Sequence, residues 1–125
     1  MSDRPVMTPS PEHPITITPT VGRVVVRING EVIADSRAAL TLQESTYPAV
    51  QYIPLADVDQ RALRPSSTAS YCPFKGDAGY AAVETAAGVV DDAVWFYEQP
   101  YQAVAEIAGH VAFYPNKAEI VVNLQ

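Results

Sequence analysis

The chain has 125 residues, about the length of one globular domain. Hydrophobic residues make up 48% of it and charged residues 18%, which is typical of a folded domain rather than a disordered one. The net charge is −6, from 14 acidic and 8 basic residues. This charge disfavours nucleic acid or an anionic membrane surface as a partner, because both attract positive surfaces.

Cysteine content and the start of the chain bear on where the protein works. Cys72 is the only cysteine, so the chain can form neither an internal disulfide nor a zinc site built from several cysteines. No apolar run approaches the roughly 20 residues that a membrane span requires. Residues 1–14 lack the basic and then apolar layout of a secretory signal. We therefore expect a cytoplasmic protein with no metal or other cofactor.

Prolines are concentrated at the start of the chain, where five of the 11 fall within the first 20 residues. Proline has no backbone donor and disfavours helix in the residue before it. Residues 1–14 are therefore predicted to form a flexible, proline-rich arm. Residues 15–125 are predicted to form a single domain rich in β structure.

Alternating apolar residues predict short β-strands in this domain. Residues 23–28, for example, place three apolar side chains on one face and two arginines on the other. Asn29-Gly30 then favours a two-residue hairpin turn, because both central residues of a type I′ turn need positive φ. Further strands are predicted over residues 31–35, 40–42, 50–53, 80–85, 89–97, 111–114 and 118–124, with the last two joined as a hairpin.

The remaining segments favour loops and little helix. Residues 65–79 are rich in Pro, Ser and Gly and predict a long loop. Pro100, followed by apolar residues at three- and four-residue spacing, predicts a short amphipathic helix that ends at Gly109. Helices do not alternate with strands, which argues against a parallel sheet. The expected fold is mainly β: a curled antiparallel sheet, barrel-like or folded into two packed layers, of seven or eight short strands with one short helix.

The segment from Tyr71 to Gly76 is the most informative one for function. Its proline favours an extended Cys72, and its glycine permits a tight turn, so that Cys72 and Lys75 would face the same side. A nearby ammonium favours thiolate over thiol, so this pair predicts an activated cysteine or an anchor for an anionic ligand group. The alternative is a small buried Cys72 beside a solvated Lys75. For Cys72 as a nucleophile the alternative is favoured, because no histidine lies nearby in the sequence.

Two other groups of residues are candidates for a site. Glu44 ends a predicted strand, where its carboxylate would transfer protons if it faced Lys75 and would otherwise be solvated. Aromatic side chains in the strands offer stacking area and polar donors for a ligand, or else they pack the core; they are Tyr52, Tyr80, Trp95 and Tyr97. His13 lies in the arm, and His110, which has no second metal ligand nearby in the sequence, is interpreted as structural.

Several segments resemble the small bacterial proteins of domain-of-unknown-function family 427. They are residues 13–17, 25–35, 71–76, 93–100 and 107–114. The resemblance covers the chain after the arm, and its most specific parts are the Cys-Pro-Phe-Lys-Gly segment and the later Trp-Phe-Tyr run.

This resemblance implies a compact β-rich fold similar to the tent-like sheets of zinc-binding Mss-type chaperones, although the present chain lacks their paired cysteines. The family also carries a nucleotidyltransferase-like label. Two-metal nucleotidyl transfer needs a Gly-Ser turn followed by paired aspartates, and the sequence has none. Position by position, the resemblance favours one ligand pocket formed by Glu44, Tyr52, Cys72, Lys75, Tyr80 and Trp95.

Two functions follow as hypotheses. In the first, the domain binds a small polar or anionic molecule in an aromatic pocket closed by the Cys72–Lys75 loop; if a reaction occurs there, Lys75 neutralises developing negative charge and Glu44 moves a proton. In the second, the domain is a non-catalytic interaction module that uses its sheet face or an open edge, for example in a homodimer. A deep pocket with Lys75 pointing inward favours the first, and a shallow exposed apolar patch favours the second.

Overall fold

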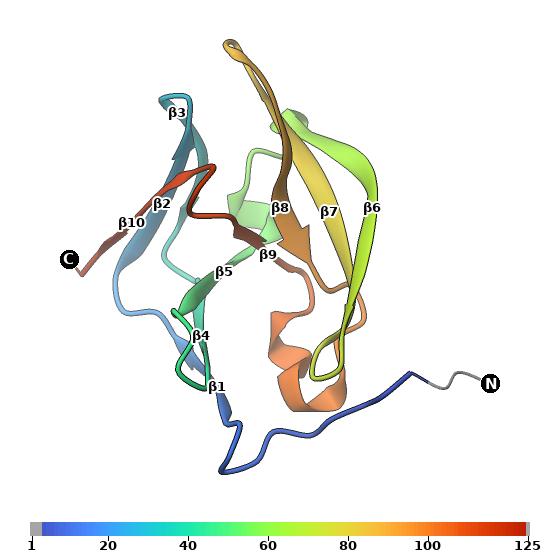
Figure 1. Ribbon diagram of the computed structural model, residues 1–125. Helices are drawn as coiled ribbons and strands as arrows, with labels where there is room; N and C mark the ends of the chain where they lie inside the picture. Colours follow the sequence, from blue (N-terminus) through green and yellow to red (C-terminus); the bar gives the residue numbers. More distant parts are fainter. Residues whose placement is uncertain (1–3, 125) are drawn as a thin grey trace.

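The computed structural model describes residues 4–124 and consists mainly of antiparallel β structure (Figure 1). Within this range the ten strands are β1 (Ile15–Pro19), β2 (Arg23–Ile28), β3 (Glu31–Ser36), β4 (Leu40–Glu44), β5 (Val50–Pro54), β6 (Leu63–Cys72), β7 (Gly76–Thr85), β8 (Gly88–Phe96), β9 (His110–Phe113) and β10 (Glu119–Asn123). Three short 3₁₀ segments are η1 (Leu55–Asp57), η2 (Gln60–Ala62) and η3 (Gln102–Ile107). No helix among the described residues is long and apolar enough to span a membrane.

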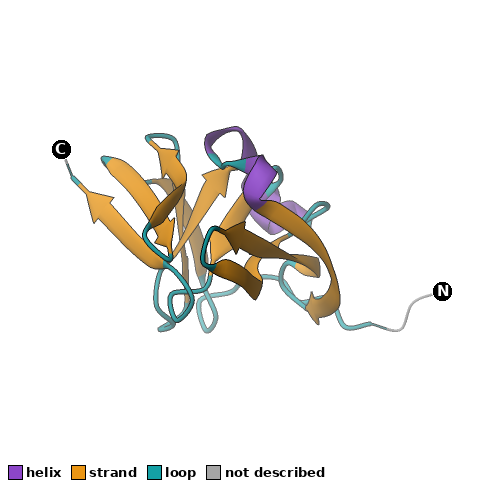
Figure 2. Cartoon of the chain, turned by 90° about the horizontal axis from the view of Figure 1, so that it is seen from above, coloured by secondary structure: helices purple, strands orange, loops and turns teal. Residues whose placement is uncertain are grey.

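The strands form two sheets. One has seven strands in the order β1-β4-β5-β9-β8-β7-β6, and the other has three in the order β10-β2-β3. Every neighbouring pair is antiparallel. Figure 1 shows the small sheet on one side of the molecule and the β8-β7-β6 half of the large sheet on the other, and Figure 2 shows the same layers from above. This arrangement confirms the predicted fold class, a mainly β protein with a curled antiparallel sheet; the large sheet is open rather than closed into a barrel.

Strand alternation places two apolar clusters inside the molecule. The larger cluster joins the two sheets through fully buried side chains such as Val24, Val26, Ile53, Val83 and Val94. The smaller cluster lies in the large sheet and beneath η3, with Leu42, Tyr52, Ala78, Tyr97, Val104, Ile107 and Ala112 as its buried members. The smaller cluster supplies the floor of the candidate site described below.

The Asn29-Gly30 turn is confirmed. Asn29 has φ of 52° and Gly30 has φ of 81°. Ile28 pairs directly with Glu31 across the turn. Both central residues thus have the positive φ that a two-residue type I′ hairpin requires.

The prediction of a long loop over residues 65–79 is wrong. This region forms β6 and β7, joined by a tight turn in which Cys72 pairs with Gly76. The sequence misleads here because β6 is an edge strand, and an edge tolerates proline and exposed polar residues that a central strand does not. A bulge between Pro65 and Ala69 interrupts the pairing, and the Asp92 carboxylate accepts hydrogen bonds there from two hydroxyl groups, at 2.6 and 2.7 Å.

Other predicted elements also differ. The strands β9 and β10 do not form a hairpin, because β9 pairs with β5 and β8 while β10 pairs with β2. The helix predicted from Pro100 to Gly109 is two 3₁₀ turns with a kink at Val104, where φ is −127°. Its few residues cannot repay the cost of starting an α-helix, and packing on the smaller cluster fixes the tighter turns instead. The strand β1 was not expected as a separate element.

The arm predicted over residues 1–14 is described from Arg4 onward, and residues 1–3 lie outside the described range. The described part is largely exposed and runs below the sheets (Figure 1). It makes hydrogen bonds to the turn between β6 and β7 and to the end of β4. The division of the chain at residue 15 stays a prediction.

Candidate functional site

A cavity of about 570 Å³ opens beside the smaller cluster. Its volume falls in the range of about 300–1,000 Å³ typical of small-molecule sites. Four of the residues predicted for a ligand pocket, Glu44, Tyr52, Lys75 and Trp95, line it. The rest of the lining is mostly apolar and aromatic and includes Leu42, Tyr47, Pro48, Val50, Tyr97, Phe113, Pro115, Ile120 and Val122.

The turn from Cys72 to Gly76 places Lys75 on the wall of this cavity. The Lys75 amide donates to the Cys72 carbonyl at 3.2 Å, and the Lys75 carbonyl accepts from the Tyr101 amide at 3.0 Å. Gly76 follows with φ of 108°, which side chains with a Cβ rarely adopt. The result is a lysine that is only 7% exposed, which is rare for this residue type without a charged partner.

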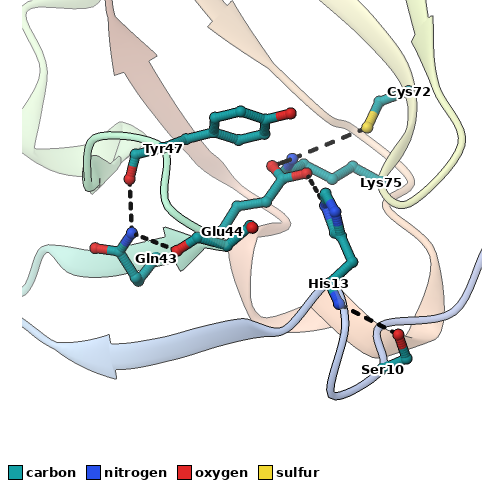
Figure 3. A network of polar contacts seen from close by, with 8 residues as sticks. Ser10, His13, Gln43, Glu44, Tyr47, Cys72 and Lys75 are labelled. Atoms are coloured by element: carbon teal, nitrogen blue, oxygen red, sulfur yellow. Dashed lines mark hydrogen bonds and ion pairs between the residues drawn. The ribbon is translucent and has the colours of Figure 1, made fainter.

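Glu44 is that partner. It ends β4, and its carboxylate Oε1 accepts a hydrogen bond from the Lys75 ammonium (Figure 3). Its Oε2 lies 2.8 Å from Nε2 of His13. Burial alone would raise the pKa of Glu44, but the hydrogen bonds from Lys75 and His13 outweigh it and lower that pKa below its ordinary value. Glu44 therefore stays ionised beside Lys75.

Cys72 lies on the far side of the ammonium from Tyr47 in Figure 3. Its Sγ is 3.9 Å from Nζ of Lys75, and the side chain is half-buried. The Lys75 ammonium is thus a direct polar neighbour of the sulfur. Cys72 does not itself line the cavity, whereas its neighbour Lys75 does.

Tyr52 and Trp95 form the aromatic wall. Tyr52 is 2% exposed, and its hydroxyl oxygen accepts a hydrogen bond from Nε1 of Trp95 at 3.3 Å. The two rings meet edge to face, with centroids 6.4 Å apart. Burial raises the pKa of Tyr52 to about 12 and also raises that of Tyr97. Both phenols therefore stay protonated, and near neutral pH the wall carries no charge.

Tyr80 lies outside this cavity. It pairs with Trp95 across β7 and β8, but its hydroxyl hydrogen-bonds Ser70 at 2.7 Å and its ring stacks against Tyr114. It borders a larger cavity, of about 810 Å³, whose lining includes Phe96. We favour the smaller cavity as the site because the buried ion pair lies there. Glu44, Tyr52, Lys75 and Trp95 thus line one cavity, and Cys72 contacts Lys75 beside it. Tyr80 packs against the same smaller cluster but lines the larger cavity.

His13 is not among the residues that the sequence predicts for the site. The strand β1 begins at Ile15, which pairs with Glu44. His13 precedes Ile15 by two residues and therefore lies close to the Glu44 carboxylate. Its ring stacks on Phe74, with centroids 4.2 Å apart and planes 8° from parallel. The available signal was the apolar alternation of residues 15–19, which predicts a strand and would have drawn the preceding histidine into the domain. Reading the prolines around it as an unpacked arm hid this signal.

The polar cluster consists of His13, Glu44, Lys75 and Cys72. Among residues 4–124, no three His, Cys, Asp or Glu side chains are grouped so that they could hold a metal ion. The cluster instead offers an ammonium donor and carboxylate acceptors whose formal charges cancel at the edge of an aromatic cavity. It can therefore orient a polar group of a bound molecule or stabilise charge that develops on it.

The model of one protein family matches residues 16–124, and its description is "Domain of unknown function (DUF427)". The match covers most of the chain, so the chain belongs to this family. No curated protein matches the chain.

Proposed function

We propose that this DUF427 protein binds a small, uncharged aromatic molecule with a polar substituent, in the cavity closed by the Cys72–Lys75 turn. The observation that carries the proposal is the Lys75–Glu44 ion pair, nearly buried in the wall of a cavity whose other lining residues are mostly apolar and aromatic. Removing two charges from water carries a desolvation penalty that offsets their attraction, and a well-packed apolar pair carries no such penalty. A nearly buried ion pair therefore contributes little to the stability of the fold. A role in binding explains its place beside a cavity.

Hydrogen-bonding capacity indicates where the ligand's polar group would lie. An ammonium has three donors, and Glu44 and Cys72 accept two of those of Lys75. The third matches a carbonyl or hydroxyl oxygen of a ligand. Because Glu44 already neutralises Lys75, an anionic ligand would bring a second negative charge close to that carboxylate. This charge balance favours an uncharged polar group over an anionic one.

Aromatic side chains account for the rest of the ligand. Tyr52, Trp95 and Tyr97 present ring surfaces along the cavity, and planar rings pack on such surfaces edge to face or offset. Tyr47 also lines the cavity and is 58% exposed. A flat ring of modest size therefore fits this wall better than a flexible or highly charged molecule.

Benzamide and benzoate test the proposal, because they have the same shape and differ in charge. Saturation-transfer NMR should detect benzamide on the parent protein and weaker or no binding of benzoate. Glu44→Gln/Lys75→Met, which removes both charges together, should lose benzamide binding while it keeps the fold. Lys117→Met, in which the chain's other lysine is replaced, serves as the matched control and should bind as the parent does. Equal binding by the double variant, or none by the parent, would contradict the proposal.

A second candidate function is favoured by the strand β10. It is the edge of the small sheet, and its Val121 and Val122 are 43% and 39% exposed. An open edge with apolar side chains can pair with the same edge of a second copy. Light scattering should then give twice the 13.5 kDa mass of one chain, and Val121→Lys should restore the single mass. A monomeric parent protein at high concentration would exclude this dimer.

A further inference from the structure

The arm is fastened to the candidate site at its beginning. The guanidinium of Arg4 lies 2.5 Å from the Asp77 carboxylate and stacks 4.1 Å above the ring of Tyr71. The Tyr71 hydroxyl donates to the carbonyl of Pro5 at 2.6 Å. Tyr71 and Asp77 flank the Cys72–Gly76 turn that carries Lys75. The start of the arm thus contacts the two strands that hold this turn.

The rest of the arm contacts the turn itself and the end of β4. The Met7 amide donates to the Pro73 carbonyl at 2.9 Å. The Pro14 carbonyl accepts from the Ser45 amide at 2.8 Å, one residue after Glu44. The arm therefore bridges the two segments that supply the opposite charges of the ion pair.

His13 lies at the centre of this bridge (Figure 3). A backbone bridge with Ser10 turns the chain there, with N–O distances of 3.0 and 3.2 Å. The ring of His13 stacks on Phe74 of the turn and hydrogen-bonds the Glu44 carboxylate. One Glu44 carboxylate oxygen thus hydrogen-bonds Lys75, and the other hydrogen-bonds His13 of the arm.

We infer that residues 4–14 are a strap that completes the ligand site, and that His13 is a positioning residue that holds Glu44 against Lys75. The inference rests on the proposed function. When the strap is open, Glu44 loses one partner, and the ammonium is held less firmly toward the cavity. Ligand binding and strap closure therefore favour one another, and thermodynamic linkage requires the coupling to be equal in both directions.

One experiment on the full chain measures both the effect of the strap on ligand affinity and the effect of the ligand on strap opening. Benzamide affinity is read from the fluorescence of Trp95, the only tryptophan. Strap opening is read from the rate at which a glutamyl endopeptidase cleaves after the exposed Glu12, with fragments identified by mass. The variants are His13→Ala, His13→Gln, whose side-chain amide can still donate to Glu44, and Thr8→Ala, an exposed arm position that serves as control.

His13→Ala should lower benzamide affinity by about five- to tenfold, and His13→Gln should restore most of it. Saturating benzamide should slow cleavage of the parent by a similar factor but should not protect His13→Ala. Thr8→Ala should match the parent in both assays. A His13→Ala protein that is folded, binds benzamide as the parent does and gains no protection would overturn the strap and leave the proposed function standing. Failure of the parent itself to bind benzamide would overturn both.

Discussion

The apolar core between the two sheets and the polar cluster beside the cavity are built in different ways. Val24, Val26, Val83 and Val94 are 0% exposed and lie inside antiparallel strands, whose pairing is interrupted by register shifts at Val26/Arg27 and Ala81/Val83. The polar cluster instead gathers one side chain from the arm, one from the end of β4 and two from the Cys72–Gly76 turn. Each of its members lies outside a strand interior or at a strand end.

This difference teaches which region stabilises the fold and which is suited to bind. Burial of apolar surface stabilises the fold by roughly 25 cal/mol per Å². Stabilisation of the fold is therefore a sufficient reason for the apolar residues of the core. A nearly buried ion pair stabilises weakly at best, because desolvation of the two charges offsets their attraction. The charges of Lys75 and Glu44 are therefore best explained by the cavity that they border.

The largest expected effect comes from breaking the ion pair. Glu44→Gln should destabilise the protein by about 4 kcal/mol, because it leaves the Lys75 ammonium buried without a counter-charge. Glu44→Gln/Lys75→Met should cost clearly less than Glu44→Gln alone, since it removes both charges. Urea denaturation of the single and double variants measures this comparison. A double variant that is less stable than Glu44→Gln would show that the pair itself stabilises the fold.

A change in the core should affect stability without affecting the site. Ile28 is 2% exposed, and Ile28→Ala should cost about 3 kcal/mol through lost burial and the cavity left behind. Val32 is 47% exposed on the same hairpin, so Val32→Ala should cost less than about 0.5 kcal/mol. Denaturation midpoints give the first quantity, and benzamide affinity of folded Ile28→Ala should equal that of the parent. Lost affinity in that variant would mean that core and site are not separate.

Acid should reduce the difference in the free energy of unfolding between the parent and Glu44→Gln. Interactions with Lys75 and His13 lower the pKa of Glu44 in the folded protein, so its contribution to stability is present above the ordinary value of 4.5 and is lost as pH falls through the folded value. Glutamine does not titrate. The stability gap between the two proteins should therefore be full near neutral pH and should shrink below about pH 4.5. A gap that stays constant to lower pH would show that the carboxylate is not held by its two partners.

The smallest effect concerns Cys72. Because the Lys75 ammonium lies 3.9 Å from its sulfur, Lys75→Met should slow alkylation of Cys72 by iodoacetamide about threefold near neutral pH. Lys117→Met retains that ammonium and should react at the parent rate. Mass spectrometry of the single thiol gives both rates. Equal rates in all three proteins would separate Cys72 from the polar cluster.

Local patterns predict the regular part of this fold well. Positive φ at Asn29 and Gly30 follows from residue type alone, and the alternation of residues 23–28 correctly places their apolar face in the core. Patterns fail where tertiary contacts decide. The strand β6 carries Pro and Ser because it forms an edge, and the segment after Pro100 is held in 3₁₀ turns by burial of Val104 and Ile107.

The candidate site is predictable only where neighbours in the sequence determine it. Cys72 and Lys75 are three residues apart, so the sequence alone shows that a turn can bring them together. Glu44 and His13 join them only through the pairing of β1 with β4 and through the packing of the arm, which no local pattern specifies. Tyr80 pairs with Trp95 but lines the other cavity, because neighbours across two strands need not line the same one.

The central claim is that the cavity beside the Lys75–Glu44 pair is the ligand site, and the chain offers one probe inside it. The indole N–H of Trp95 gives the only tryptophan side-chain signal in a proton–nitrogen correlation spectrum, and it donates to Tyr52 in the cavity wall. Titration with benzamide should move this signal saturably, together with the backbone amide of Lys75, and should leave the amide of Leu63, at the larger cavity, in place. A stationary indole signal, or shifts confined to the surroundings of Leu63, would contradict the claim.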